Sequence, residues 1–371
     1  MAGPVPARMP GPAKQGIADL VADACREGFS ERWACAQVGV GHSRYLSWKQ
    51  RAAAGGALDD EPPGPLAGEA LHALLDWEKD EIVAVAKGWD KVDLSHRKLA
   101  HRASRLGRVH ASESTFLRVL TWAGIRLPGV PRPVSASRKT PWPDWVEPVP
   151  GQLWIYDFTH FKNLPGWCAI AVEDMVSRYC LALGLYPEET STQVELAFID
   201  ALGADGKDWL LEDPDFAQAL RSGEVPGNDD RVPVLCAVSD NGPQMTSSQT
   251  AQFMAIARIA QHVGRPGTPN DQAWIESFFG HLKAEHPHLD AIADPAQMRR
   301  ELAHLQNHYN TIRLHQAIGY VTPDDEHHGK GPAIRKARVD GLDKARANRI
   351  STRRAELRHN RTQQTATDEG N

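Results

Sequence analysis

Three acidic residues stand in short motifs whose spacing could serve the cutting and joining of phosphodiester bonds. Asp157 lies in the alternating apolar run 154–159, which is typical of a core strand. Asp240 ends the apolar run 232–238 and precedes an Asn-Gly turn signal. Glu276 follows after 35 intervening residues, where a loop rich in proline and glycine runs into an amphipathic helix. Two strand ends and one helix can therefore bring three carboxylates to one point.

Carboxylates grouped in this way suit metal-dependent phosphoryl transfer. In-line attack on phosphorus develops charge on the entering and leaving oxygens, and two divalent ions roughly 3.5–4 Å apart can hold both. Magnesium is usually bound by one or two carboxylates together with substrate phosphates. Asp157, Asp240 and Glu276 are therefore the candidate catalytic and metal-binding residues, although the 47 acidic residues of the chain offer many other triples.

Five stretches in a fixed order carry a resemblance to a known family. They are residues 154–159, 172–178, 239–247, 265–285 and 309–323. Together they resemble the integrase-core transposases of bacterial insertion sequences, in particular the product of the second reading frame, and more distantly the retroviral integrases. The resemblance implies an α/β, RNase-H-like core with a mixed sheet flanked by helices, Mg²⁺ or Mn²⁺ as cofactor, and strand cleavage and transfer at element ends. It also places the catalytic roles on Asp157, Asp240 and Glu276.

Two cations within these stretches are candidates for DNA contact. Lys283 follows Glu276 by seven residues, or two helical turns, so both side chains should project from one helix face. The resemblance implies that Lys283 touches the DNA backbone; a solvated surface lysine is the alternative. Arg313 lies in a segment expected to dock on the core as a helix, and it could face a DNA phosphate.

Basic residues are also concentrated ahead of the core, although the net charge of the chain is −5. Between Lys91 and Lys139, eleven basic residues stand against two acidic ones, which indicates a polyanionic partner. Residues 95–122 have a helix-turn-helix rhythm in which Ser112 caps the second, groove-entering helix, and residues 32–51 have the same form. A plain helical hairpin is the alternative for each. The candidate DNA contacts in these units are Arg44, Lys49, Arg97, Lys98, Arg108 and Arg118.

Changes in composition divide the chain into seven segments, each with its own expected structure. Residues 1–15 should be disordered, 16–54 a helix-turn-helix unit, 55–70 a linker, 71–126 a helical DNA-binding region with the second helix-turn-helix, 127–151 a semi-rigid proline-rich linker, 152–325 the catalytic core and 326–371 a basic tail. Such a tail is usually a solvated helix or a disordered arm, and it could add nonspecific DNA affinity.

Two further features of the core are interpreted from the sequence. The 82 residues between Asp157 and Asp240 exceed the usual spacing of the family, and the excess falls in the acidic segment 203–232. That segment could be a surface helix with a loop or a protein-contact site. Asp174 is expected to be structural, at the end of a second strand.

The remaining composition narrows the environment and the partners. Five cysteines without a Cys-x-x-Cys pair make a disulfide framework or a zinc site unexpected, which fits a reducing cytoplasm. A protein that acts on DNA there is expected to associate with the nucleoid. No apolar run of ~18 residues predicts a membrane span. The expected partners are double-stranded DNA at element ends and target, further copies of this chain on DNA, and a protein from an upstream frame. Two other function classes stay open: a structure-selective nuclease of the same fold, and an inactive repressor derived from a transposase.

Overall fold

The computed structural model describes residues 5, 9–55, 58, 70–128, 146, 148–212, 233–264 and 273–368. The chain divides into two compact units, residues 1–73 and 74–371. Most of the two predicted linkers and residues 213–232 of the acidic segment lie outside the described residues.

The first unit is a small helical domain. Its helices are α1 (Gly11–Arg26), α2 (Glu31–Gln37) and α3 (His42–Ala53). The Ser30 hydroxyl accepts a hydrogen bond from Trp33 N–H and so caps α2. Tyr45 and Trp48 of α3 are buried against the other two helices. Because α1 begins at Gly11, the predicted disordered segment 1–15 extends too far, and its last five residues are helical.

The second unit begins with three helices, α4 (Asp76–Trp89), α5 (His96–Arg105) and α6 (Glu113–Trp122). Ser95 and Ser112 cap α5 and α6 through their hydroxyl groups, as the sequence predicts for Ser112. One apolar cluster holds the three helices together, and it is built around Ile82, Leu99 and Phe116, which are fully buried. The helices of the predicted helix-turn-helix units are therefore present, while their docking on DNA stays a prediction.

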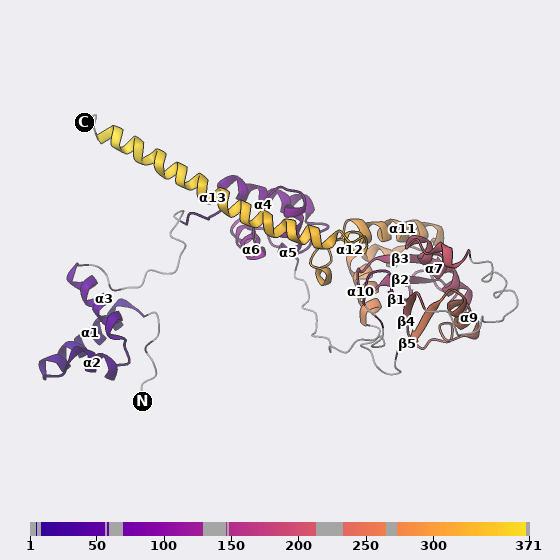
Figure 1. Cartoon of the computed structure of the whole chain (residues 1–371), viewed down its shortest axis with the longest axis horizontal. Helices are drawn as coiled ribbons and strands as arrows, with labels where there is room; N and C mark the ends of the chain where they lie inside the picture. The colour runs from indigo at the N-terminus through magenta and orange to yellow at the C-terminus, as the bar shows by residue number, and fades with distance from the viewer. Residues whose placement is uncertain are drawn as a thin grey trace. The chain divides into compact units, whose positions relative to one another are not determined.

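A five-stranded mixed sheet forms the core that follows (Figure 1). Its strands are β1 (Leu153–His160), β2 (Cys168–Asp174), β3 (Cys180–Tyr186), β4 (Leu235–Ser239) and β5 (Ile259–Val263). The spatial order is β3-β2-β1-β4-β5, with β1, β2 and β3 antiparallel and with β4 parallel to both β1 and β5. This order is that of the RNase-H-like fold, which confirms the predicted fold class.

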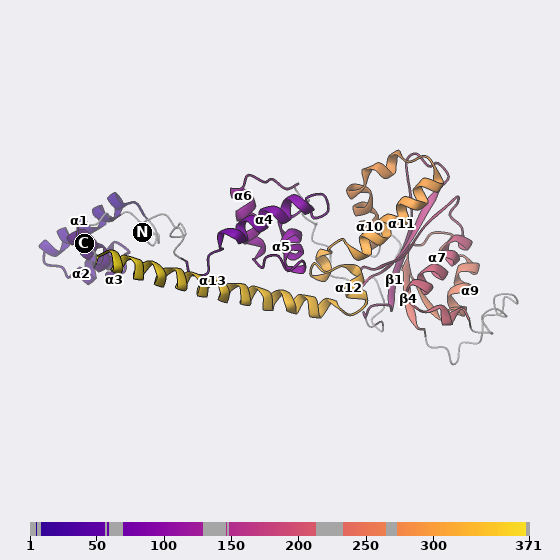
Figure 2. The ribbon, with the colours of Figure 1, turned by 90° about the horizontal axis from the view of Figure 1, so that it is seen from above.

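Helices cover both faces of the sheet (Figure 2). One face packs against α7 (Ser191–Ala204) and α9 (Ser248–Ile256), and the other against α10 (Ala273–Glu285) and α11 (Pro295–Thr311). Short helical turns complete the core: η1 (Asp208–Leu210), η3 (Pro287–Ala291), η4 (Gln316–Ile318) and α12 (Pro323–His327). Alternate residues of each strand point to opposite faces, so each face contributes its own apolar cluster.

The chain ends in the long helix α13 (Gly331–Asp368). Of its arginines, Arg338 and Arg349 are buried, with 7% and 8% of their surface exposed. The Arg349 guanidinium forms a bidentate ion pair with Glu78 of α4. The tail therefore forms a helix, which was one of the two predicted alternatives, but the charges of Arg338 and Arg349 are not solvated because they bind partners within the chain.

Candidate active site

Asp157 and Asp240 are placed side by side by two neighbouring parallel strands. Ile155 of β1 pairs in register with Val238 of β4, and Asp157 and Asp240 each follow two residues later. The side chains of Ile155 and Val238 belong to the cluster on the α10 face. Because β1 continues to His160, the alternation of the strand directs Asp157 toward the same face, and Asp240 follows directly after the last residue of β4. The carboxyl ends of parallel strands are where ligands commonly bind in such sheets.

Glu276 approaches the same sheet face from helix α10. The buried residues Ile275, Phe278, Phe279 and Leu282 recur at helical spacing and press one side of α10 onto the sheet. Glu276 lies beside this stripe in the first turn and is exposed. The first turn of the helix that faces the two aspartates therefore carries the third carboxylate.

The protonation of Asp157 reflects this arrangement. Burial raises the pKa of the Asp157 carboxyl to about 7, a hydrogen bond from Phe158 N–H counteracts the rise, and repulsion from Asp240, Glu276 and Glu189 adds to it. The three predicted carboxylates therefore lie close enough to repel one another. A partly buried cluster of like charges is poised to accept a cation.

Glu189 is a fourth acidic residue near this cluster. It lies just ahead of α7, and its carboxylate is 3.3 Å from Nε2 of His160 at the end of β1. The sequence does not predict a role for Glu189, because this residue lies outside the five stretches that carry the family resemblance. The strand register accounts for the position of Glu189. His160 pairs with Cys168, and Cys168 pairs with Tyr186, which precedes Glu189 by three residues.

The loop after β4 fixes the orientation of Asp240. Gly242 N–H donates to Asp240 Oδ1 at 3.0 Å, which closes a short turn of the type that Asp favours. A Cβ atom on Gly242 would lie 3.0 Å from the same oxygen and 2.9 Å from Nε2 of Gln244. The glycine of the Asp-Asn-Gly motif therefore leaves room for the carboxylate.

Cations hold α10 in place at both ends. In its first turn, the Arg178 guanidinium lies over the ring of Trp274, 3.7 Å from the centroid. In its last turn, Lys283 Nζ donates to Thr159 Oγ1 and to the His160 carbonyl oxygen, both at 2.7 Å. Lys283 thus ties the helix of Glu276 to the strand of Asp157. Arg178 is buried and has a positive φ of 65°, because it lies in the tight turn between β2 and β3.

Arg313 contacts the same helix through an ion pair, while its predicted contact with DNA stays a prediction. Its guanidinium donates two hydrogen bonds, of 2.8 and 2.7 Å, to the Glu285 carboxylate at the end of α10. Although burial opposes it, pairing with Arg313 lowers the pKa of Glu285 to about 2. Only 7% of Arg313 is exposed, so its charge is committed inside the fold.

The other basic residues predicted to contact DNA differ in whether their side chains are paired with acidic neighbours, buried or exposed. Three form ion pairs with acidic neighbours: Lys49 with Glu31, Arg97 with Glu113 and Arg108 with Glu81. Lys98 is partly buried, and burial together with the charge of Arg313 lowers its pKa. Arg44 lies over the Trp48 ring, and Arg118 is exposed on α6, where it donates to Thr115. Of this group, Arg118 is best placed to meet a phosphate.

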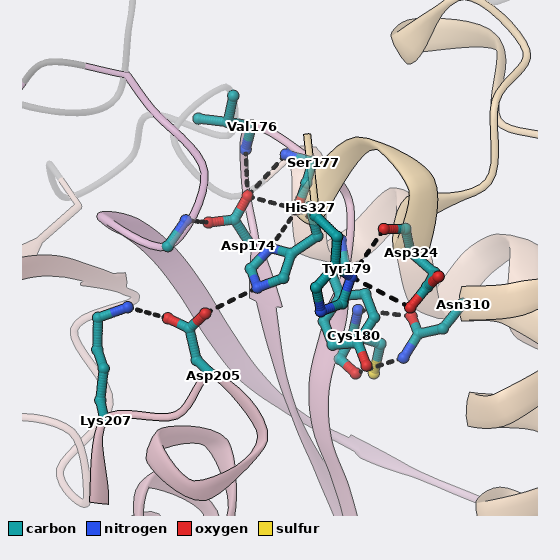
Figure 3. Close-up of polar contacts among 12 residues, drawn as sticks. Asp174, Val176, Ser177, Tyr179, Cys180, Asp205, Lys207, Asn310, Asp324 and His327 are labelled. Carbon is teal, nitrogen blue, oxygen red and sulfur yellow. Dashed lines mark hydrogen bonds and ion pairs between the residues drawn. The ribbon is translucent and has the colours of Figure 1, made fainter. Parts of the chain in front are cut away.

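Asp174 belongs to a separate buried network and has the structural place expected of it (Figure 3). Its carboxylate accepts hydrogen bonds from the N–H groups of Gly151, Val176 and Ser177 and from the Ser177 hydroxyl. Ser177 Oγ is 3.0 Å from Nδ1 of His327 on α12. The network therefore fixes the β2–β3 turn to the segment that leads into α13.

The chemistry of the donors suits a hard divalent cation. Among the described residues, no three His, Cys, Asp or Glu side chains are grouped tightly enough to hold a metal ion in their present positions. Asp157 nevertheless feels the charges of both Asp240 and Glu276, and all three side chains offer the oxygen ligands that magnesium prefers. Within the same part of the chain, no helix has the length and apolarity to cross a membrane.

Comparisons with known proteins agree with this arrangement. Residues 257–323 match the integrase core domain family. The transposase for insertion sequence element IS904 of Lactococcus lactis subsp. lactis (strain IL1403) is 26% identical over 181 residues, covering 48% of this chain and 61% of that protein. The transposase for insertion sequence element IS629 of Shigella sonnei is 24% identical over 311 residues, covering 81% of this chain and 92% of that protein. This chain therefore spans less than two thirds of the first relative and most of the second.

Solved structures of viral integrases also align with part of the chain. The catalytic core of HTLV-2 integrase in complex with magnesium, in its dimeric form, has a TM-score of 0.35 and 19% identity over 48% of this chain and 98% of that one. A simian T-cell lymphotropic virus intasome in complex with PP2A regulatory subunit B56 gamma has a TM-score of 0.39 and 18% identity over 59% of this chain and 68% of that one. Part of this chain is therefore similar to the integrase core domain, and its relatives include transposases of insertion sequences.

Proposed function

We propose that this protein is a DNA transposase that cleaves the ends of an insertion element and transfers the freed strand into target DNA. The observation that carries the proposal is the placement of Asp157 and Asp240 at one level of adjacent parallel strands, facing the helix of Glu276. The relatives of the chain support it, because those with 26% and 24% identity are described as transposases.

The roles of the protein groups follow from the site. Asp157, Asp240 and Glu276 would hold Mg²⁺ or Mn²⁺ as a pair of ions, which would stabilise charge on the entering and leaving oxygens. Arg178, Lys283 and Arg313 keep α10 in place, so that Glu276 meets the two aspartates. Gly242 holds the Asp240 carboxylate through its N–H group, and its missing side chain leaves room for that carboxylate. No protein side chain is needed as general base when a bound water is the first nucleophile.

The substrate and partners proposed are double-stranded DNA, further copies of this chain assembled on it, and an upstream-frame protein. DNA reading is assigned to the helical units ahead of the core. On α6, the exposed Arg118 lies near Trp122, of which 81% is exposed, so this helix presents both a cation and an aromatic ring to a partner. A DNA substrate would place the protein at the nucleoid.

One experiment separates this function from its alternatives. Purified protein is incubated with labelled element-end DNA, a target duplex and Mg²⁺, and both cleaved and joined products are measured. A transposase gives both products; the nuclease alternative gives cleavage without joining. The repressor alternative gives specific binding without either product. The proposal fails if wild-type protein binds element ends and yields no joined product with Mg²⁺ or Mn²⁺.

A further inference from the structure

Helix α13 spans from the catalytic core to the helical region of residues 74–128. Its arginines Arg338, Arg349 and Arg353 lie on one face, because spacings of eleven and four residues correspond to about three turns and one turn. The three side chains are hydrogen-bonded to different parts of the same unit. Between Arg338 and Arg353 the helix therefore has one face that binds the chain, and Figure 1 shows this part of α13 beside α4 and α5.

The far contact is a buried ion pair with α4. Arg349 donates to both oxygens of Glu78, at distances of 2.8 to 3.0 Å, and to the His110 carbonyl oxygen at 2.5 Å. Four residues on, Arg353 donates to the Leu74 carbonyl oxygen at 2.9 Å. The exposed fractions of the Arg349 and Glu78 side chains are 9% and 4%. A buried charge is tolerated only when it is paired. Any shift of α13 relative to α4 would leave Arg349 and Glu78 unpaired, so the contact favours one relative position of the two helices.

The near end of the helix is fixed to the core. Arg338 donates to the carbonyl oxygens of Gly319, at 2.7 Å, and Tyr320. Just before α13, His327 lies between Ser177 Oγ, at 3.0 Å, and Asp205 Oδ1, at 2.8 Å (Figure 3). Both of those partners belong to the catalytic core. The base of α13 is therefore attached to the turn after β2 and to the end of α7.

A second set of contacts joins α5 directly to the core. The buried Arg102 donates to Asp93 at 2.7 Å and to the Ile312 carbonyl oxygen at 2.6 Å. Arg105 pairs with Asp325 of α12, and the ring of His101 stacks on Tyr320 with centroids 4.5 Å apart. Two independent links thus connect the helical region to the core.

We propose that α13 acts as a strut that fixes the spacing between the DNA-reading helices α4–α6 and the three carboxylates, with Arg349 as its positioning residue. This inference rests on the proposed function and deepens it. The attached stretch from Arg338 to Arg353 covers 15 helical steps, or roughly 22 Å, and it transmits position because one continuous helix joins the two attachment points. The strut would thereby select which phosphodiester is cut relative to the sequence that is bound.

The test measures where the protein cuts, rather than how fast. End-labelled element DNA is cleaved by wild type, Arg349→Met and Glu78→Gln, and the products are mapped at single-nucleotide resolution. Wild type should cut at one position, while each variant should spread its cuts over neighbouring positions, with the share at the main position reduced about threefold. The double variant Glu78→Arg with Arg349→Glu restores opposite charges and should restore the single position. Asp340→Asn, which breaks an exposed ion pair on the same helix, is the matched control and should leave the pattern unchanged.

A second measurement keeps the strut testable without catalysis. Spin labels at the exposed residues Ser114 of α6 and Thr192 of α7 report the distance between the two regions. Wild type and Asp340→Asn should give one narrow distance distribution, and Arg349→Met a broad one. Arg349→Lys, which keeps the charge but loses the bidentate contact, replaces Arg349→Met if that variant does not fold. A narrow distribution and a single cut position in the folded Arg349 variant would overturn the strut. If wild type does not cut DNA, the proposed function fails. The spin-label distance distributions still test whether α13 fixes the spacing between the two regions.

Discussion

Asp157 and Asp240 stand at the same level of two adjacent parallel strands, each two residues beyond the paired Ile155 and Val238. The spacing between parallel strands therefore sets the separation of the two carboxylates, and a rigid part of the fold maintains it. Glu276 comes from a helix, so its approach depends on how that helix is held. Contacts of Lys283, Arg178 and Arg313 hold this helix in place.

The anchor of α10 predicts a change in metal dependence. Lys283→Met removes both hydrogen bonds to the end of β1, and Thr159→Val removes one of them. Because outer contacts of metal ligands typically contribute 10–100-fold to affinity or activity, the Mg²⁺ concentration for half-maximal cleavage should rise by about tenfold or more in Lys283→Met. Thr159→Val should show a smaller rise in the same direction.

The control for this anchor is Lys162→Ala, since Lys162 is 81% exposed and pairs with Asp290 at the surface. It should leave the Mg²⁺ requirement unchanged. The alternative role of Lys283 as a DNA contact makes a different prediction: a shallower salt dependence of DNA binding with an unchanged Mg²⁺ requirement. Titrations of cleavage against Mg²⁺ and of binding against salt distinguish the two roles.

The turn after β4 gives a prediction about orientation. Gly242→Ala places a Cβ atom against Asp240 Oδ1 and the Gln244 side chain, so the carboxylate must shift. A displacement of about 1 Å at a reacting centre can cost about 10²-fold, and we expect a loss of that order in the cleavage rate. Gly280→Ala is the matched control, because a Cβ at that position on α10 meets nothing within 4 Å. It should keep its activity and gain about 0.5–1 kcal/mol of stability, since alanine favours helices. Equal rates in the two variants would remove the steric role of Gly242.

The pKa of Asp157 leads to a signed prediction for stability. In the folded protein, burial and repulsion raise this pKa from 3.8 to about 7, so the folded state holds the proton more tightly than the unfolded chain does. The stability that this proton contributes is fully present below about pH 4 and is lost as the pH rises to about 7. Without metal, Asp157→Asn should therefore have a higher Tm than wild type at pH 8, and the difference should vanish near pH 4.

The same titration predicts a response to metal. Mg²⁺ should raise the Tm of wild type at pH 8, because a bound cation offsets the repulsion, and should raise that of Asp157→Asn much less. Thermal melts of both proteins at the two pH values, with and without Mg²⁺, check both statements. A lower Tm for metal-free Asp157→Asn at pH 8 would show that the carboxylate is not strained in the fold.

The buried pair of Arg313 and Glu285 predicts a structural effect instead of a DNA-binding one. Removing one partner of a buried ion pair typically costs 3–5 kcal/mol, so Arg313→Met should lower the free energy of unfolding by about that amount. Arg313→Lys should recover little, because an ammonium group cannot reproduce the two hydrogen bonds to Glu285. Denaturant melts measure the loss. An Arg313→Met variant of unchanged stability with weakened DNA binding would support the DNA contact predicted for this residue.

The core of this fold could be predicted from the sequence because its signals are local. The apolar alternation around Asp157 belongs to one strand and the Asn-Gly turn after Asp240 to the end of another, and both strands form as expected. Asp157 lies within β1, although the sequence predicts it at a strand end. The amphipathic helix of Glu276 also forms as expected.

The roles of the basic residues could not be predicted in the same way, because the sequence around a basic residue does not show which acidic residue it will pair with in the fold. Arg349 meets Glu78 across 271 residues of sequence, and Arg313 meets Glu285 across 28. Counting basic residues treats all of them as free, whereas folding pairs many of them with acidic groups. The count of basic residues in the tail therefore predicts a solvated helix or a disordered arm that could add DNA affinity, whereas Arg338 and Arg349 are buried against the chain.

The most direct test of the catalytic assignment is strand transfer by three variants that keep shape and lose charge: Asp157→Asn, Asp240→Asn and Glu276→Gln. Each is compared with wild type in the joined-product assay with Mg²⁺, after its fold and its binding of element-end DNA are verified. Because the three carboxylates act as one unit, each variant should lose strand transfer by about 10³-fold or more, and a double variant should be little worse than the worst single one. Near wild-type strand transfer by any one of these folded, DNA-binding variants would contradict the account, since that carboxylate would then have no part in the reaction.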